Sequence, residues 1–384
     1  MTQGLPYRRF AGFYFFYFAY LGAFAPFFSL YLLAAGHSAF EIGVLMALPA
    51  VGRILAPHLW GWLADTGGRR MGLVRATTAA GLVCYAGVFA GTGFAWLFAV
   101  LLATSFFLAA ALPLVDANTL EHLGEDTGRY GPVRVWGSLG YIVAVVAVGH
   151  ALDWFPVSAL LWIVAGMLAG MLAYCWLLPE ARAAAHASDA LPIWHIVKRP
   201  EVVALIAACA LMAAAHGPYY TFYSIHVVAH GYSKAVTGWL WALGVICEIG
   251  IFVWMPYLVR AFSLRAILIA SFALAVARFL LIGWGADSLA LLLLAQSMHA
   301  ASFGSFHAAA IAMVHRLFRG RHQTRGQAIY GSLSFGLGGG LGALASGYLW
   351  GAVGAQWTFT LAAFCALTGG ILAWRAAPGS GRTA

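Results

Sequence analysis

Ionisable side chains interrupt long apolar runs at five positions: Arg53, Asp116, Arg134, Glu248 and Arg278. A charge inside a membrane-spanning segment is costly, and by default it marks a substrate pathway or a coupling site. Three positive charges against two negative charges leave a surplus of one, which a carboxylate substrate would neutralise. The alternative role is structural, as ion pairs that brace a helical bundle.

Aromatic side chains accompany these charges. His216 begins the sequence HGPYY, whose proline predicts a kink of the kind that is tolerated where a helix lines a cavity. Tyr219 and Tyr220 end that sequence, and Tyr20 lies on an aromatic face of the first apolar run. These rings predict an arene-lined cavity, with packing and interfacial belts as the alternative.

Two histidines, His299 and His307, share one apolar run near the C-terminal end. On a straight α-helix His299 and Ser302 share a face, while His307 points roughly 80° away from His299. Both histidines are candidates for moving a proton. The alternative is that each is a buried side chain with its hydrogen bonds satisfied.

The composition indicates what must hold these residues in place. Of 384 residues 63% are hydrophobic and 9% are charged, and the mean hydropathy is +0.86, whereas a soluble domain needs roughly a quarter of its residues charged. A membrane-spanning helix needs about 20 apolar residues. We therefore expect an all-α membrane protein with twelve spans, near 10–34, 42–63, 71–91, 95–115, 134–152, 157–178, 202–226, 236–258, 264–284, 288–313, 327–349 and 355–375.

The loops predict orientation and organisation. Nearly all Lys and Arg residues outside the spans fall on one side, and only Lys234 falls on the other, so the positive-inside rule places both termini in the cytoplasm. The longest polar connection, 179–201, would be a cytoplasmic linker between six-helix bundles at 1–178 and 202–384. We expect a multi-pass protein of the cell inner membrane.

The two halves also repeat. A shift of 195 residues superposes Gly36 and Ser38 on Gly231 and Ser233. Two pseudo-symmetric six-helix halves are typical of a transporter that rocks about a site near the bilayer midplane.

One cytoplasmic loop carries a signature. The sequence GWLADTGGRR fits the pattern G-x-L-A-D-x-x-G-R-[KR] at every fixed position, through Gly61, Asp65, Gly68, Arg69 and Arg70. This resembles the conformational loop motif of the major facilitator superfamily, and an ordinary charged turn is the alternative. The resemblance implies the twelve-helix fold of that superfamily.

Further stretches narrow the resemblance. PLVD, YGPVRVWGS, PYY, LWALGVICE and MHAASFGSFH are similar to the phenylpropionate permease family, a relative of the lactose permease branch, and the similarity covers nearly the whole chain. It implies a symporter driven by the proton gradient, with no cofactor. In lactose permease, the residues that match Asp116 and Arg134 hold the sugar, and those that match Glu248 and Arg278 couple the proton. Its coupling glutamate is absent, because Ser302 occupies that position.

Other functions are less consistent with the sequence. An enzyme or an ATP-driven pump would need a catalytic set, a metal-spaced cluster or a GxxxxGK[ST] loop, and a channel would need a filter assembled by symmetry. The net charge of +9 is dispersed in loops, which does not favour nucleic acid. A drug exporter and a sugar or nucleoside symporter remain alternatives. The expected partners are the lipid bilayer and a small anionic substrate, and the expected state is a monomer.

The predicted mechanism joins these residues. An aromatic acid is held through its carboxylate by Arg134 or Arg53, with its ring among Tyr20 and the HGPYY tyrosines. Glu248 carries the proton because Ser302 has no carboxylate to do so. On the neighbouring spans, Arg278 and His299 would assist that transfer.

Overall fold

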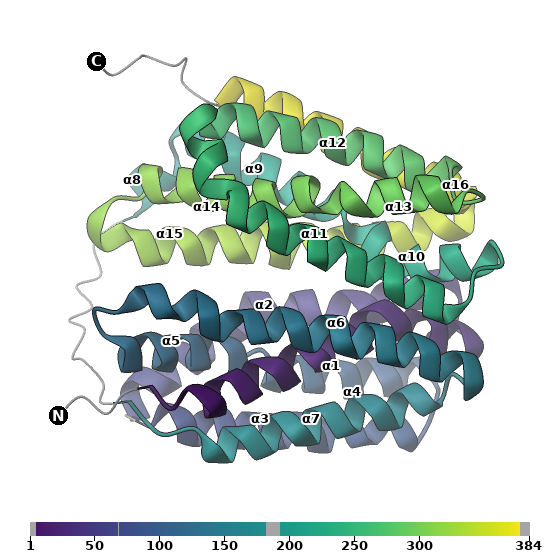
Figure 1. The fold of residues 1–384 in the computed structure, drawn as a ribbon, viewed down its shortest axis with the longest axis horizontal. Helices are drawn as coiled ribbons and strands as arrows, with labels where there is room; N and C mark the ends of the chain where they lie inside the picture. The colour runs from purple at the N-terminus through teal and green to yellow at the C-terminus, as the bar shows by residue number, and fades with distance from the viewer. Residues whose placement is uncertain (1–4, 68, 182–192, 377–384) are drawn as a thin grey trace. The chain divides into compact units, whose positions relative to one another are not determined.

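The computed structural model describes residues 5–67, 69–181 and 193–376, and within these ranges the chain is helical without a β-strand (Figure 1). This is expected in lipid, because a helix satisfies its backbone hydrogen bonds internally. The first helices are α1 (Tyr7–Ala34), α2 (Ala39–Gly67), α3 (Arg70–Ala86), α4 (Phe94–Leu108), α5 (Ala111–Leu123), α6 (Tyr130–Trp154) and α7 (Ala159–Leu177). They are followed by α8 (Trp194–Val197), α9 (Pro200–Ala215), α10 (Gly217–Ala229), α11 (Lys234–Ala261), α12 (Leu264–Trp284), α13 (Leu289–Ser297), η3 (Ala300–Ser305), α14 (Phe306–Leu317), α15 (Gln323–Tyr330), η5 (Gly331–Gly338) and α16 (Gly339–Ala376).

The prediction of an all-helical membrane protein is confirmed. In the described residues, ten helical stretches are long and apolar enough to cross a bilayer, and the last of them, Arg325–Arg375, has 51 residues. That stretch is broken at Gly354, where φ is 80° and the backbone is not helical. Because a span needs about 20 residues, it supplies two. With α2, which has 29 residues, the described part of the chain contains all twelve predicted spans.

Several spans of the described residues are interrupted rather than continuous, among them the fourth, which breaks between α4 and α5. The predicted kink of the seventh span appears as a break between α9 and α10 at His216. The tenth and eleventh spans contain the π-helical turns η3 and η5, which the sequence pattern did not reveal. Such turns are frequent at functional sites.

The predicted internal repeat has a structural counterpart in two turns. Gly36 and Gly231 have φ of 89° and 85°, a conformation that glycine adopts without steric cost. In the helix that follows, the hydroxyl of Ser38 or Ser233 accepts a hydrogen bond from the backbone N–H three residues later, at 3.3 and 3.2 Å. Both halves therefore start their second helix with the same glycine turn and serine cap.

Packing divides the chain into two compact units. Unit 1 comprises Met1–Ala187 and Gly231–Ala242, and unit 2 comprises Ser188–His230 and Leu243–Ala384. The first turns of α11 thus group with unit 1. The functional division into 1–178 and 202–384 stays a prediction, and residues 182–192 of the predicted linker lie outside the described residues.

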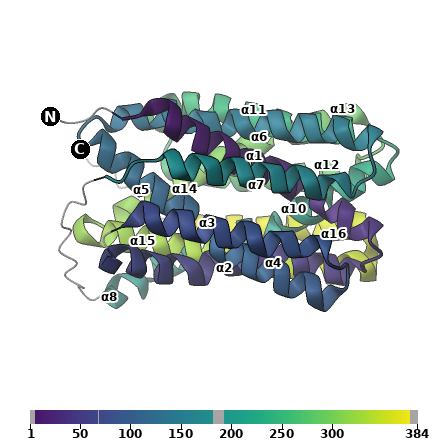
Figure 2. The ribbon, with the colours of Figure 1, turned by 90° about the horizontal axis from the view of Figure 1, so that it is seen from below.

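Within unit 1, α1 packs along α6 and α7, and α4 packs against α2 and α3 (Figure 2). α1 and α6 approach each other closely at Gly140, where an added β-carbon would lie 2.1 Å from the carbonyl oxygen of Phe15. Glycine is therefore required there.

Within unit 2, α16 packs against α9, α10 and α12. An added β-carbon at Gly217, the first residue of α10, would lie 2.2 Å from the carbonyl carbon of Gly342. The glycine after His216 thus lets α10 approach α16 closely, which fixes the direction in which the HGPYY segment continues.

Candidate functional site

A fully buried arginine, Arg278 of α12, is the centre of the polar cluster in unit 2. Its Nε donates to the carbonyl of Ala295 at 3.1 Å, and its Nη1 lies 3.3 Å from His216 Nε2 and 3.4 Å from Ser302 Oγ. Its guanidinium carbon lies 4.1 Å from the ring centroid of Tyr219. No carboxylate in the described ranges lies within 4 Å of this guanidinium.

His216 faces Arg278 as a neutral acceptor. Its Nδ1 lies 2.8 Å from the carbonyl oxygen of Met212, and because a carbonyl only accepts, Nδ1 carries the proton. Nε2 is then free to accept from the guanidinium. The break between α9 and α10 places the histidine where it holds Arg278 without neutralising its charge.

Three nitrogens of this cluster have no hydrogen-bond partner although they are buried: Nη2 of Arg278, Nε2 of Gln296 and Nδ1 of His299. Tyr219 contacts all three residues, because its hydroxyl donates to Gln296 Oε1 at 3.1 Å and its ring lies 5.4 Å from that of His299. A buried polar atom without a partner costs roughly 1–3 kcal/mol. The nitrogens of Arg278 and Gln296 are donors and so suit an acceptor of hydrogen bonds, while His299 Nδ1 donates or accepts according to its tautomer.

The two histidines of the tenth span lie in one column of stacked rings. His299 stacks on Phe303 with centroids 5.3 Å apart, and Phe303 stacks on His307 at 6.0 Å. The expectation that His307 points away from His299 is wrong, because η3 is wound more widely than an α-helix and so aligns residues eight apart. His307 Nδ1 is 3.0 Å from the hydroxyl of Tyr330.

Glu248 lies on the side of α11 that faces this cluster. Its Cγ would be 3.1 Å from a β-carbon added at Gly304 of η3. One turn earlier, a β-carbon added at Gly244 would lie 3.3 Å from the His299 ring and 3.4 Å from Gln296 Oε1. Among the described residues, no basic side chain is within 4 Å of the Glu248 carboxylate.

A second polar cluster lies in unit 1 around Asp116 of α5, which is only partly exposed. Its Oδ1 accepts from the hydroxyls of Tyr14 and Tyr130 at 2.7 and 3.0 Å. Tyr14 also lies 3.0 Å from Thr119 Oγ1. Asp116 and Arg134 form no ion pair within 4 Å in the described structure, so tyrosines hold this carboxylate.

The arginines of unit 1 differ in their surroundings. The guanidinium carbon of Arg134 lies 4.1 Å from the ring centroid of Phe18 and 5.3 Å from that of Tyr14, so Arg134 already has cation–π partners. Arg53 is exposed. Tyr20 is buried, with 8% of its surface exposed.

The loop motif is described in part. Arg70 forms an ion pair with Glu121 of α5, and Arg69 is exposed. The side chain of Asp65 and residue Gly68 lie outside what the structure describes, so the predicted conformational role of the motif stays a prediction.

Sequence reasoning missed four members of these clusters. In unit 2 they are Gln296 and Phe303, and in unit 1 they are Tyr14 and Tyr130. Gln296 could have been found, since an amide inside an apolar run three residues before His299 shares its helix face. The tyrosines were hidden among the many aromatic residues of their spans.

Known proteins resemble this chain over most of its length. The model of the MFS_1 like family matches residues 7–361. A probable 3-phenylpropionic acid transporter of Escherichia coli (strain K12) is 30% identical over 327 residues, which cover 84% of this chain and 86% of that protein. A maltose permease of Geobacillus stearothermophilus is 40% identical over 144 residues, which cover 37% and 36%. The crystal structure of the nucleoside transporter NupG has a TM-score of 0.86 at 17% identity, covering 96% of this chain and 98% of that one, which shows a shared fold.

Proposed function

This chain belongs to the MFS_1 like family of major facilitator transporters, and from that membership we propose that it imports a small aromatic carboxylate together with a proton. The chain is a secondary transporter and not an enzyme. The relative named as a probable 3-phenylpropionic acid transporter supports an arylpropionate as the substrate class.

The charge of Arg278 supports this function most directly. An isolated guanidinium inside a membrane protein is costly unless an anion compensates it, and within the described residues no carboxylate is close enough to do so. A substrate carboxylate supplies the missing charge and accepts from Arg278 Nη2, with Gln296 Nε2 as a second donor. We prefer Arg278 to the predicted Arg134 or Arg53, because Arg278 is fully buried with one nitrogen unpartnered, whereas Arg134 is half-buried and Arg53 is exposed.

The substrate ring has aromatic neighbours available in the same unit. Tyr220 is 36% exposed and stacks on His216 with centroids 6.0 Å apart, while Phe303 lies 6.5 Å from Tyr220. An aromatic ring gains about 0.5–1.5 kcal/mol from such pairs beyond its buried area. An aromatic acid therefore fits the cluster better than an aliphatic one.

The proton is assigned to Glu248. This carboxylate has no basic partner within 4 Å in the described ranges, and inside a membrane its neutral form is the less costly one. Its position beside the helix face that contacts His299 and Gln296 puts proton binding and anion binding in one unit. Uptake of a proton with the acid then moves no net charge into the bilayer.

A neutral, hydroxyl-rich substrate is the second candidate. Asp116, with Tyr14 and Tyr130, offers an acceptor flanked by hydroxyl groups, and such a set suits a sugar or a nucleoside. The relative named as a maltose permease favours this reading for part of the chain.

A thermal-shift screen separates the two candidates. Purified protein is heated with 3-phenylpropionate, its uncharged primary amide, maltose or a nucleoside, because a ligand of the folded state raises the apparent Tm by mass action. We expect stabilisation by the acid alone, and its loss in Arg278→Gln. Stabilisation by maltose or the nucleoside and not by the acid would reject the proposal.

A further inference from the structure

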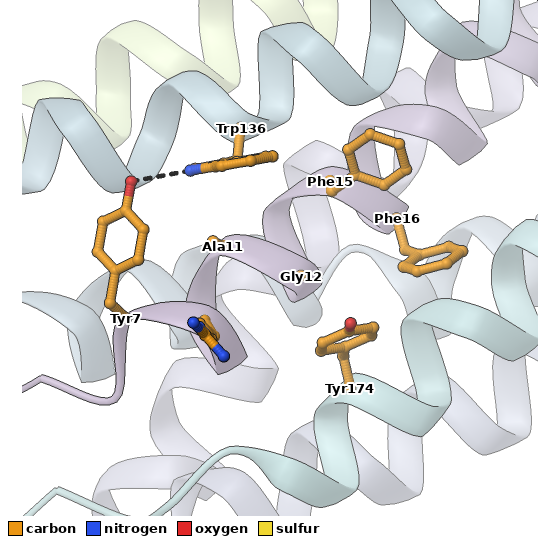
Figure 3. A pocket seen from close by; sticks show the side chains of 8 residues that line it. Tyr7, Ala11, Gly12, Phe15, Phe16, Trp136 and Tyr174 are labelled. Carbon is orange, nitrogen blue, oxygen red and sulfur yellow. Dashed lines mark hydrogen bonds between the residues drawn. The ribbon is translucent and has the colours of Figure 1, made fainter.

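A groove of about 330 Å³ runs along the N-terminal half of α1 (Figure 3). Its walls come from α6, through Trp136, and from α7, through Tyr174. Its floor is α1, where a β-carbon added at Gly12 would lie 1.9 Å from the Tyr174 ring. The absence of a side chain at Gly12 thus lets Tyr174 lie against α1.

The groove lies on the opposite face of α1 from the Asp116 cluster. Gly12 and Tyr14 are two residues apart, which on an α-helix separates their side-chain directions by roughly 200°. Tyr14 points to Asp116, so the face that carries Gly12 points away from it. On the flanking helices α6 and α7, large apolar side chains are exposed, among them Val135 and Trp176, as expected of surfaces that contact lipid.

One end of the groove is polar and basic. Trp136 Nε1 donates to the hydroxyl of Tyr7 at 2.8 Å, and that hydroxyl donates to the carbonyl of Pro132 at 3.1 Å. Tryptophan and tyrosine are enriched at the level of lipid headgroups. Arg9 is engaged with the carbonyl of Leu177, whereas Arg8 is exposed and lines the groove.

The other end is apolar and reaches a depth that suits one leaflet. Phe16 lines it, and its ring lies 5.5 Å from that of Tyr174. From Tyr7 to Phe16 the helix rises roughly 14 Å, and half of the hydrocarbon core is about 15 Å. The groove thus offers a cation at headgroup level and an aromatic surface along one acyl chain.

We propose that this groove binds an anionic glycerophospholipid, with the phosphate at Arg8 and one acyl chain along Tyr174 and Phe16. The charge of Arg8 and the alignment of a basic end with an apolar end select this occupant over a neutral lipid. Because the site lies on the opposite face of α1 from Asp116, its occupancy is separate from substrate binding.

Native mass spectrometry of the purified, delipidated full chain tests the proposal, with phosphatidylglycerol as the probe. We expect Arg8→Gln to bind about five-fold more weakly than the natural protein, since one basic residue near an anionic surface has an effect of that size. Arg8→Lys should keep most of the affinity. Arg260→Gln is the matched control, because Arg260 is also exposed beside an aromatic ring, that of Tyr257.

Equal phosphatidylglycerol affinity in Arg8→Gln and Arg260→Gln would overturn the placement of the phosphate. Equal binding of phosphatidylethanolamine by the natural protein would overturn the selection of an anion. Thermal stabilisation by inorganic phosphate as large as that by phosphatidylglycerol would remove the role of the acyl chain.

Discussion

The variant Gln296→Glu tests whether the cluster around Arg278 binds an anion. The amide nitrogen of Gln296 has no partner and its amide oxygen already accepts from Tyr219. In Gln296→Glu, a carboxylate at this position would neutralise Arg278 from within the protein. We expect the affinity for 3-phenylpropionate, measured by thermal shift or scintillation proximity, to fall at least about tenfold, because hydrogen bonds to charged groups contribute roughly 1.5–3 kcal/mol.

The matched control is Gln327→Glu, which adds the same charge to unit 2 at a side chain bonded to the carbonyl of Ile311. It should leave the affinity unchanged. If both variants lose the acid equally, the added charge acts on folding or on the field of the whole unit, and Gln296 is not a ligand.

A substitution at Glu248 tests whether its carboxylate carries the coupled proton. Glu248→Gln keeps the shape of the side chain and removes the proton site, so accumulation against a gradient should cease while exchange of labelled for unlabelled substrate continues. Exchange needs no net proton movement, and the two assays in proteoliposomes therefore diverge. Accumulation by Glu248→Gln would place the coupling proton elsewhere.

At the scale of the element, α11 offers a paired test. Gly244 faces His299 and Gln296, where an added β-carbon would lie at 3.3 and 3.4 Å, whereas a β-carbon at Gly250 meets nothing within 4 Å. Both Gly→Ala changes gain about 1 kcal/mol of helix propensity. We expect Gly244→Ala alone to weaken substrate binding, by a few fold, in the thermal-shift assay. Equal substrate affinity in the two variants would mean that the Gly244 face of α11 does not contact the binding site.

Sequence reasoning predicted the spans, but it did not predict the π-helical turns within them. Apolar length predicted every span, because lipid admits only helices of that size. It did not predict η3 or η5, since a π-helical turn leaves the apolar pattern unchanged and arises from packing. That turn is what aligns His299, Phe303 and His307.

The site residues that could be predicted are those whose ionisable side chain interrupts an apolar run. Arg278, Glu248 and His216 stand out in apolar runs. The structure brings Arg278 and His216 together, and it places Glu248 beside Gly304, on the span that carries His299. The hydroxyls that hold Asp116 do not stand out, because Tyr14 and Tyr130 belong to spans rich in rings. Partner choice depends on helix rotation, which a single sequence does not specify.

For the whole molecule, the distribution of basic residues predicts both termini in the cytoplasm and the chain in the inner membrane. A reporter fused after Arg375 should therefore show cytoplasmic activity, and one inserted at Tyr232 should show periplasmic activity. The reverse pattern would mean that every loop lies on the opposite side of the membrane from the one assigned.

We propose proton-coupled movement of an aromatic carboxylate as the function of this transporter. Its most direct test is uptake of labelled 3-phenylpropionate into proteoliposomes that contain the natural chain and have an alkaline interior. We predict accumulation above the external concentration, collapse of that accumulation when a protonophore removes the pH gradient, and none in Arg278→Gln. Uptake that only equilibrates, whatever the gradient, would contradict proton-coupled transport of the acid.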